Sequence, residues 1–152
     1  MHGHGANPDG FYDLRTWLGY LLNKDELQLS DSELNTSNYQ NKSSINTLSF
    51  VSPENFIQVL RGKNSLGTLL DSLGYKSVPS VSDPSTNGTF YYSGGYNTSA
   101  HGSAITGSPI SSIQLELPKP GIRENSVQWR NYSESLVIAL QKYFKAHYNI
   151  DL

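Results

Sequence analysis

The strongest constraint on the fold of this 152-residue chain is one amphipathic segment near its C-terminus. From about Ser126 to His147, apolar residues recur every three or four positions, which predicts a long helix with one buried face. That face carries Trp129, Leu136, Val137, Leu140, Tyr143 and Phe144. Such a stripe must be buried against other apolar elements, so the rest of the chain has to supply a core. His147, in the last turn, is expected to be a cation that interacts favourably with the helix dipole.

Two short segments upstream of this helix have the character of strands. The apolar run 17–22 is rich in aromatic and branched side chains and predicts a buried strand. Apolar and polar residues alternate over 113–117, and Pro118 ends that pattern. The alternation places Gln114 and Glu116 on one face of the second strand.

The middle of the chain predicts two shorter helices and two polar loops. Ser52-Pro53-Glu54 is typical of a helix start, and residues 65–73 have leucines at helical spacing before Gly74, the expected left-handed cap. The polar stretches 35–44 and 75–112 lack periodicity and are expected to be loops. The longer one is expected to form an ordered surface layer, because aromatic residues interrupt it. The order strand, helix, helix, strand, helix indicates an α/β domain.

Composition excludes several functional classes. The chain has 36% hydrophobic residues, no cysteine and a formal net charge of −2. A disulfide framework, a thiolate zinc cluster and a cysteine nucleophile are therefore excluded, and the near-neutral charge gives no electrostatic footprint for nucleic acid. No run of about 18 apolar residues occurs, so no membrane span is predicted.

Five residues are candidates for chemistry. Glu116 is either a solvent-facing residue of a half-buried strand or a general acid or base on a rigid element, because a carboxylate in an apolar strand is costly to bury. His2 and His4 are able to reach one zinc ion, or else belong to a flexible terminus. His101 lies in a Gly/Ser-rich loop, where it is either a site residue or a plain surface histidine. Arg123 follows the Glu116 strand by one short turn and is the arginine best placed to bind a substrate carboxylate.

Seven short segments also stand in a characteristic order along the chain. They are His2-Gly3-His4-Gly5, Arg15-Thr16-Trp17-Leu18-Gly19-Tyr20, Ser65-Leu66-Gly67, Gly74-Tyr75, Val78-Pro79-Ser80, Tyr92-Ser93-Gly94-Gly95-Tyr96-Asn97 and Ile113-Gln114-Leu115-Glu116-Leu117. In that order they resemble the C-terminal part of the N-formylglutamate amidohydrolase-like hydrolases, and the resemblance covers nearly the whole chain. It implies that residues 1–152 are a single partial domain, the C-terminal portion of a three-layer, zinc carboxypeptidase-like α/β fold with a mixed sheet.

The resemblance also implies a site and a reaction. In that family a His-x-x-Glu pair on an early loop and a later histidine bind zinc, and His2 matches the later histidine, with His4 as the alternative. Glu116 matches the general base and acid. The substrate-binding residues that the resemblance implies are Arg123, His101 and Tyr96. The implied activity is zinc-dependent hydrolysis of an amide bond in an N-acyl amino acid or a related small molecule.

No His-x-x-Glu occurs in the chain, so the other zinc ligands are expected from a missing N-terminal part, and the chain by itself is expected to be inactive. The expected partner is a small amide substrate, and binding to nucleic acid or to a membrane is not expected. The alternative is a non-catalytic domain that has lost the metal site and binds carbohydrate or peptide through the tyrosine-rich loop 91–96. An upstream His-x-x-Glu would distinguish the enzyme from the binding domain.

Five Asn-x-Ser/Thr triplets are acceptor motifs for N-linked glycans. They begin at Asn35, Asn41, Asn87, Asn97 and Asn131. About two or three would arise by chance in a chain so rich in asparagine, serine and threonine. The excess is suggestive of a secreted protein, although the N-terminal residues have neither the basic start nor the apolar stretch of a signal peptide.

Overall fold

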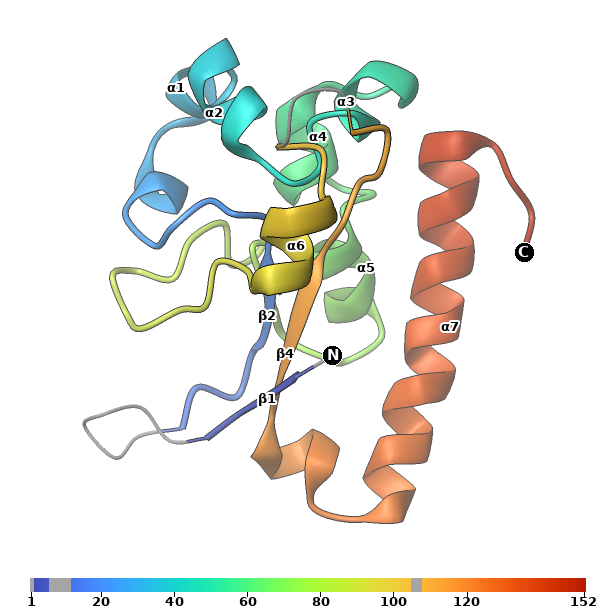
Figure 1. The fold of residues 1–152 in the computed structure, drawn as a ribbon. Coiled ribbons are helices and arrows are strands. Elements are labelled where there is room, and N and C mark those ends of the chain that lie inside the picture. The colour runs from blue at the N-terminus through green and yellow to red at the C-terminus, as the bar shows by residue number, and fades with distance from the viewer. Residues whose placement is uncertain (1, 6–11, 105–107) are drawn as a thin grey trace.

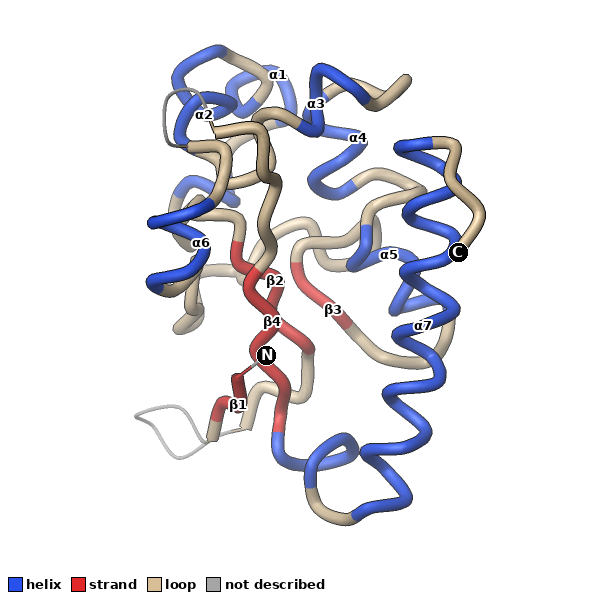
Figure 2. The backbone as a smooth tube through the Cα atoms, turned by 45° about the vertical axis from the view of Figure 1, so that its right-hand side comes forward, coloured by secondary structure: helices blue, strands red, loops and turns tan. Residues whose placement is uncertain are grey.

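The computed structural model describes residues 2–5, 12–104 and 108–152. These residues form an α/β arrangement around a four-stranded mixed sheet (Figures 1 and 2). The strands are β1 (His2–His4), β2 (Thr16–Gly19), β3 (Ser77–Val78) and β4 (Gln114–Pro118). Their spatial order is β1-β4-β2-β3. The β1–β4 and β2–β3 pairs are parallel, whereas β2 and β4 are antiparallel.

The helical elements are η1 (Glu26–Gln28), α1 (Asp31–Leu34), α2 (Ser37–Lys42), α3 (Leu48–Val51), α4 (Phe56–Arg61), α5 (Leu66–Ser72), α6 (Tyr96–His101), η2 (Lys119–Arg123) and α7 (Ser126–Tyr148). Helix α7 stands along one side of the molecule, and α6 crosses the sheet in front of β2 and β4 (Figure 1). The small helices α1 to α4 gather at one end of the sheet. Within the described residues, no helix combines the length and apolar content needed to cross a bilayer.

The two faces of β4 have different neighbours. Leu115 lines a small cavity together with Leu140, Tyr143 and other residues of α7. Gln114 and Glu116 line a different cavity, together with residues of segment 92–97. This alternation confirms that Gln114 and Glu116 share one face of the strand, as the sequence pattern predicts.

The hydrophobic core lies between the sheet and helices α4, α5 and α7. Its fully buried side chains include Trp17, Leu18, Tyr20, Leu22, Phe56, Leu60, Leu70 and Val78. The predicted helix over 65–73 is confirmed, because Ser65 caps α5 by accepting a hydrogen bond from the Thr68 backbone N–H, and Gly74 has the left-handed φ of 90°. Helix α4 is confirmed too, but its N-cap is Asn55 rather than Ser52.

Two of the predicted loops contain regular structure. Helix α2 lies within the stretch 35–44, and both β3 and α6 lie within 75–112. Helix α2 buries none of its residues and α6 buries Thr98, so neither has the apolar stripe from which a helix is predicted. The strand predicted over 17–22 ends early, at Gly19, because Leu21 has a φ of 64° and donates its backbone N–H to Ser93 O (2.6 Å).

The serine-rich segment after α6 is attached to the turn before α3 by hydroxyl groups. Ser103 Oγ donates to Ser44 O (3.0 Å) and accepts from the Thr47 backbone N–H (3.0 Å). Ser44 Oγ donates to Ser112 O (2.7 Å), and the Ser112 N–H donates to Ser44 O (2.9 Å). The described part of this segment is therefore ordered by side chain–backbone hydrogen bonds rather than by apolar burial.

His147 is buried rather than exposed at the end of α7, which corrects the expectation that it is a cation there. Its Nε2 lies 3.0 Å from Asn64 O, and its Nδ1 lies 2.8 Å from Ser52 Oγ. Because a carbonyl oxygen only accepts, Nε2 carries the proton and the neutral ring accepts from the Ser52 hydroxyl at Nδ1. Burial lowers the pKa of His147, although Asn64 O and the Glu54 carboxylate oppose that shift.

Lowering the pH is therefore expected to destabilise the fold through His147. In the unfolded chain this residue takes up a proton near its ordinary pKa of about 6.5. The folded protein takes it up only at lower pH, so the unfolded state binds more protons below about pH 6.5 and unfolding becomes easier there. Urea denaturation from about pH 8 to about pH 5 measures this dependence. His147→Gln is expected to reduce this dependence, and the part due to the buried His4 remains. The exposed His101→Gln is the control. An unchanged slope in His147→Gln contradicts the assignment.

Candidate functional site

The predicted face of β4 borders a cavity of about 490 Å³. Its floor is formed by Gln114 and Glu116, and its wall by segment 92–97 with the start of α6. Gly3 of the neighbouring strand β1 completes the lining. The cavity therefore collects residues from the N-terminal strand, the tyrosine-rich loop and the strand that precedes α7.

Glu116 is the buried acid of this cavity, with a relative exposure of 7%. Among the described residues, its recorded hydrogen-bond donor is Gln114, whose Nε2 lies 3.0 Å from Glu116 Oε1. Trp17 of β2 is its cross-strand partner. A carboxylate in such a setting is held on rigid backbone and largely shielded from water, which are the conditions in which a general base or acid acts.

Strand β1 places the two N-terminal histidines beside this acid. In the β1–β4 register His2 is opposite Glu116, and His4 is opposite Pro118. The side chain of His2, the predicted zinc ligand, lies outside the described part of the chain. His4 is 5% exposed, and its ring stacks on that of Trp17 with centroids 3.8 Å apart and an interplanar angle of 5°.

The His4 ring is fixed in one tautomer. Its Nε2 lies 3.1 Å from Arg15 O, which only accepts, so Nε2 carries the proton. The other ring nitrogen, Nδ1, is buried and has no hydrogen-bond partner among the described residues. Burial lowers the pKa of His4, although backbone groups of Arg15 and Gly5 and the nearby carboxylates oppose it. A neutral His4 thus has an unshared electron pair on Nδ1.

An ion-pair network supports Trp17 and therefore the His4 ring. Trp17 Nε1 donates to Asp13 Oδ2 (3.0 Å), and Arg15 Nη2 donates to the same oxygen (2.7 Å). Arg15 Nη1 also donates to Asp83 Oδ1 (3.1 Å). Burial opposes the ionisation of Asp13, but the hydrogen bonds from Arg15 and Trp17 outweigh it and lower the pKa of this carboxyl. Sequence reasoning missed this network, because nothing in the sequence connects Arg15, which begins one of the quoted segments, with Asp13 or with the distant Asp83.

The other predicted site residues divide between the cavity and its surroundings. Tyr96, the first residue of α6, lines the cavity and is 79% exposed. His101, the last residue of that helix, is exposed, lies edge-on to the Tyr96 ring at 6.3 Å and is not part of the cavity lining. The structure thus brings Glu116, Gln114 and Tyr96 together around one space, and leaves His101 at its periphery.

Arg123 links two strands instead of facing the cavity. Its Nε donates to Leu117 O (2.9 Å) and its Nη2 to His4 O (2.8 Å). The guanidinium covers Gly3, where an added Cβ would lie 2.2 Å from Arg123 Cζ. Arg123 therefore ties the end of β1 to β4, and its predicted contact with a substrate carboxylate stays a prediction.

Gly19 lets the cavity wall approach the sheet. A Cβ at this position would lie 2.7 Å from both Gly94 N and Ser93 O, which are backbone atoms of the cavity wall. Gly19→Ala is therefore expected to displace segment 93–94 and to lower the free energy of unfolding by about 1–3 kcal/mol. Urea denaturation measures the change, with Gly5→Ala as the control, because among the described residues no atom lies within 4 Å of a Cβ there. A wild-type midpoint for Gly19→Ala would contradict this close approach.

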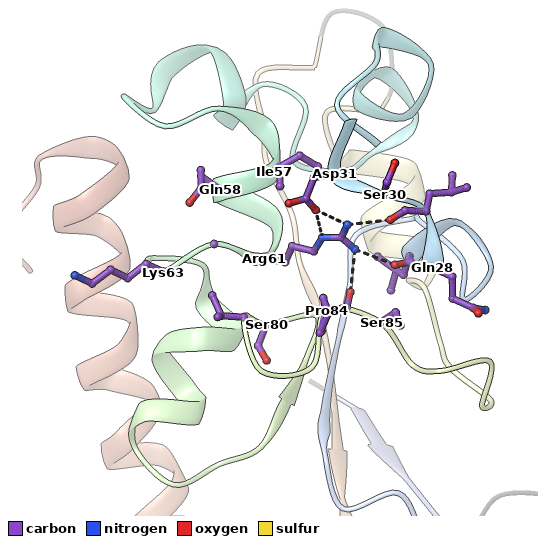
Figure 3. A pocket seen from close by; sticks show the side chains of 14 residues that line it. Gln28, Ser30, Asp31, Ile57, Gln58, Arg61, Lys63, Ser80, Pro84 and Ser85 are labelled. Carbon is purple, nitrogen blue, oxygen red and sulfur yellow. Dashed lines mark hydrogen bonds and ion pairs between the residues drawn. The ribbon is translucent and has the colours of Figure 1, made fainter. Parts of the chain in front are cut away.

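A larger cavity, of about 620 Å³, lies around Arg61 at the other end of the sheet (Figure 3). Arg61 Nε and Nη2 donate to Asp31 Oδ1, Nη2 donates to Leu29 O (3.0 Å), and Nη1 donates to Leu27 O (2.9 Å) and Pro84 O (3.2 Å). All five guanidinium N–H groups are thereby used. Arg61 is a structural clamp between η1, α1, α4 and the loop at Pro84, with no donor left for an anion.

Within the described part of the chain, no group of three or more His, Asp or Glu side chains is arranged to hold a metal ion. Comparison of the chain with protein-family models, with curated proteins and with solved structures finds no significant match. The family resemblance of the motifs therefore remains an expectation.

Proposed function

We propose that the protein is a zinc-dependent amidohydrolase of the N-formylglutamate amidohydrolase type, with a carboxypeptidase-like fold, and that it hydrolyses the amide bond of an N-acyl amino acid or a related small molecule. The observation that carries this proposal is the position of Glu116. It is a buried carboxylate on a rigid strand, it lines a cavity of small-molecule size, and β1 with its two histidines lies directly beside it.

In this proposal Glu116 moves one proton twice. It first accepts a proton from the attacking water as the water oxygen bonds to the amide carbon. It then donates that proton to the amide nitrogen as the C–N bond breaks, which releases a carboxylic acid and an amine. Gln114, whose amide donates to Glu116 Oε1, holds the carboxylate in the orientation needed for both transfers.

The histidines of β1 supply the protein's side of the metal site in this proposal. Zinc, when bound, lowers the pKa of a coordinated water and polarises the amide carbonyl. The unshared electron pair on His4 Nδ1 is suited to such a ligand set, with His2 from the same strand. A catalytic zinc needs about three protein ligands, so at least one more has to come from outside the described residues.

An amine-release assay tests the proposal. The protein expressed from the full transcript that contains these residues is incubated with formyl, acetyl and succinyl amino acids, and free amine is measured. Turnover is expected, with loss after chelation and recovery with zinc. A folded, zinc-supplied protein that releases no amine from any of these substrates contradicts the proposal.

A non-catalytic binding domain is the second candidate, and exposed aromatic rings favour it. Phe90, Tyr92 and Tyr96 are 45%, 52% and 79% exposed, and the last two line the cavity. Aromatic faces of this kind suit sugar rings or peptide side chains. Titration calorimetry distinguishes the two functions. Binding of an oligosaccharide or peptide that is unaffected by chelation, without any turnover, favours the binding domain.

A further inference from the structure

The five Asn-x-Ser/Thr triplets are not equivalent in the folded protein. All five asparagines are exposed, but the triplets differ in the burial and contacts of their other residues. We propose that three of them are attachment sites for N-linked glycans in the native protein: Asn35, Asn87 and Asn131. This inference does not depend on the proposed hydrolase activity.

Asn87 lies at the tip of a loop. Asn87, Gly88 and Thr89 are all exposed, and the first two have left-handed φ values of 53° and 80°. The carbonyl oxygen of the Asn87 side chain accepts a weak bond from Ser85 Oγ (3.4 Å), while its amide nitrogen, the atom that carries a glycan, has no hydrogen bond among the described residues. The surrounding yellow-green loop projects from the molecule at the left of Figure 1.

Asn35 and Asn131 are also exposed residues. Asn35, Thr36 and Ser37 are all exposed, and Asn35 Oδ1 accepts from Gln40 Nε2 (3.1 Å), which directs the amide group without using its nitrogen. Asn131 lies on the outer face of α7, between the exposed Val127 and Glu134. Tyr132, the middle residue of this triplet, is buried, but Asn131 and Ser133 are exposed, and the Ser133 hydroxyl donates to Trp129 O (2.8 Å) within the same helix. Within the part of the chain that the structure describes, the Asn131 side chain makes no hydrogen bond.

The remaining two triplets are partly built into the fold. Ser43, the third residue of the Asn41 triplet, is buried and donates its hydroxyl to Tyr20 O (3.0 Å). In the other triplet, Asn97 itself lines the cavity with Glu116. A glycan on Asn97 would cover the entrance to that cavity, so we expect Asn41 and Asn97 to be unmodified.

The modification needs a specific donor and enzyme. An oligosaccharyltransferase joins the asparagine Nδ2 to the anomeric carbon of a lipid-diphosphate-linked oligosaccharide. The bond from that carbon to the diphosphate oxygen breaks, and the proton lost by the amide ends on the released lipid diphosphate. The proposal therefore also commits the chain to the secretory pathway, in which such donors occur.

Peptide mapping of the protein from its native cells tests the proposal. Peptide N-glycosidase in heavy-oxygen water converts each glycan-bearing asparagine to labelled aspartate, which mass spectrometry locates. Label is expected at positions 35, 87 and 131 and not at 41 and 97. Unmodified asparagine at all three positions overturns the proposal. Label confined to positions 41 and 97 overturns the choice of sites made from the structure.

A variant pair separates glycan attachment from loss of an asparagine contact. The full chain, behind a secretion leader, is translated in the presence of microsomes, and protease protection identifies the translocated molecules. Thr89→Ala is expected to lose one glycan, whereas Thr89→Ser keeps it, and both retain Asn87. The exposed Asn38→Gln lies outside any triplet and is expected to change nothing. Translocated wild-type chains without glycan, or equal glycan numbers in both Thr89 variants, contradict an Asn87 site.

Discussion

In the protein expressed from the full transcript, the proposed function predicts that replacing Glu116 by glutamine lowers the turnover of an N-acyl amino acid by about 100-fold to 10,000-fold, the usual contribution of a general acid and base. Glutamine keeps the size of the side chain, and its carbonyl oxygen is still able to accept the hydrogen bond from Gln114. It is unable to take a proton from water or to return one to the leaving amine. The loss is therefore expected in kcat rather than in stability.

Two further measurements make this result specific. Zinc content, measured by elemental analysis, is expected to be unchanged in Glu116→Gln, because the proposal gives this residue a proton-transfer role. The matched control is Glu134→Gln, an exposed glutamate on α7 that is expected to have wild-type kinetics. Near-normal turnover in Glu116→Gln excludes it as the base, and loss of zinc would make it a ligand instead.

Replacing Arg61 by leucine is expected to have the largest effect on stability, about 3 kcal/mol. The guanidinium is buried and bonds to three backbone carbonyls as well as to Asp31, so its removal leaves acceptors in η1 and the loop at Pro84 without their donors. Urea denaturation measures the change. Because none of these residues lines the cavity of Glu116, the variant that remains folded is expected to retain the kcat of the proposed reaction.

Arg61→Lys shows which property of the arginine matters. Lysine keeps the positive charge but lacks the planar array of five donors, so it is expected to recover less than half of the lost stability. Arg130→Leu, an exposed arginine on α7, is the control. A lysine variant as stable as the wild type would attribute the effect to the charge alone, and a wild-type midpoint for Arg61→Leu would contradict the clamp.

The elements that could be predicted from the sequence are those whose own residue pattern indicates their type. Helix α7 forms where the apolar stripe predicts it, but Trp129 and Val137 of that stripe are exposed, and the buried residues are Tyr132, Ala139, Tyr143 and His147. Helix α5 has leucines between a serine cap and a glycine, and β4 alternates until Pro118. The same alternation predicted that Gln114 and Glu116 share a face, and the structure places both at one cavity. Local periodicity was sufficient there, because the apolar spacing within each of these elements indicates its type without reference to distant residues.

The missed features depend on contacts between distant segments. Strand β1 has only three residues, and its partner is more than a hundred positions away in the chain. The backbone contacts of Arg123 and the burial of His147 likewise depend on where separate elements come together. Helices α2 and α6 have few buried residues, so their sequences resemble those of polar loops.

The hydroxyl-bonded attachment of Ser103 and Ser112 to the turn at Ser44 has a consequence for how the molecule opens. Detaching this layer would break hydrogen bonds but expose little apolar surface, so the opening would have a small denaturant m-value and a small heat-capacity change. The backbone amide protons that this layer protects would then exchange with solvent through local opening, and their exchange rates would hardly change at low urea concentrations. Helix α6, whose first residues line the cavity of Glu116, leads directly into this layer, so such an opening would extend to the cavity wall without unfolding of the core.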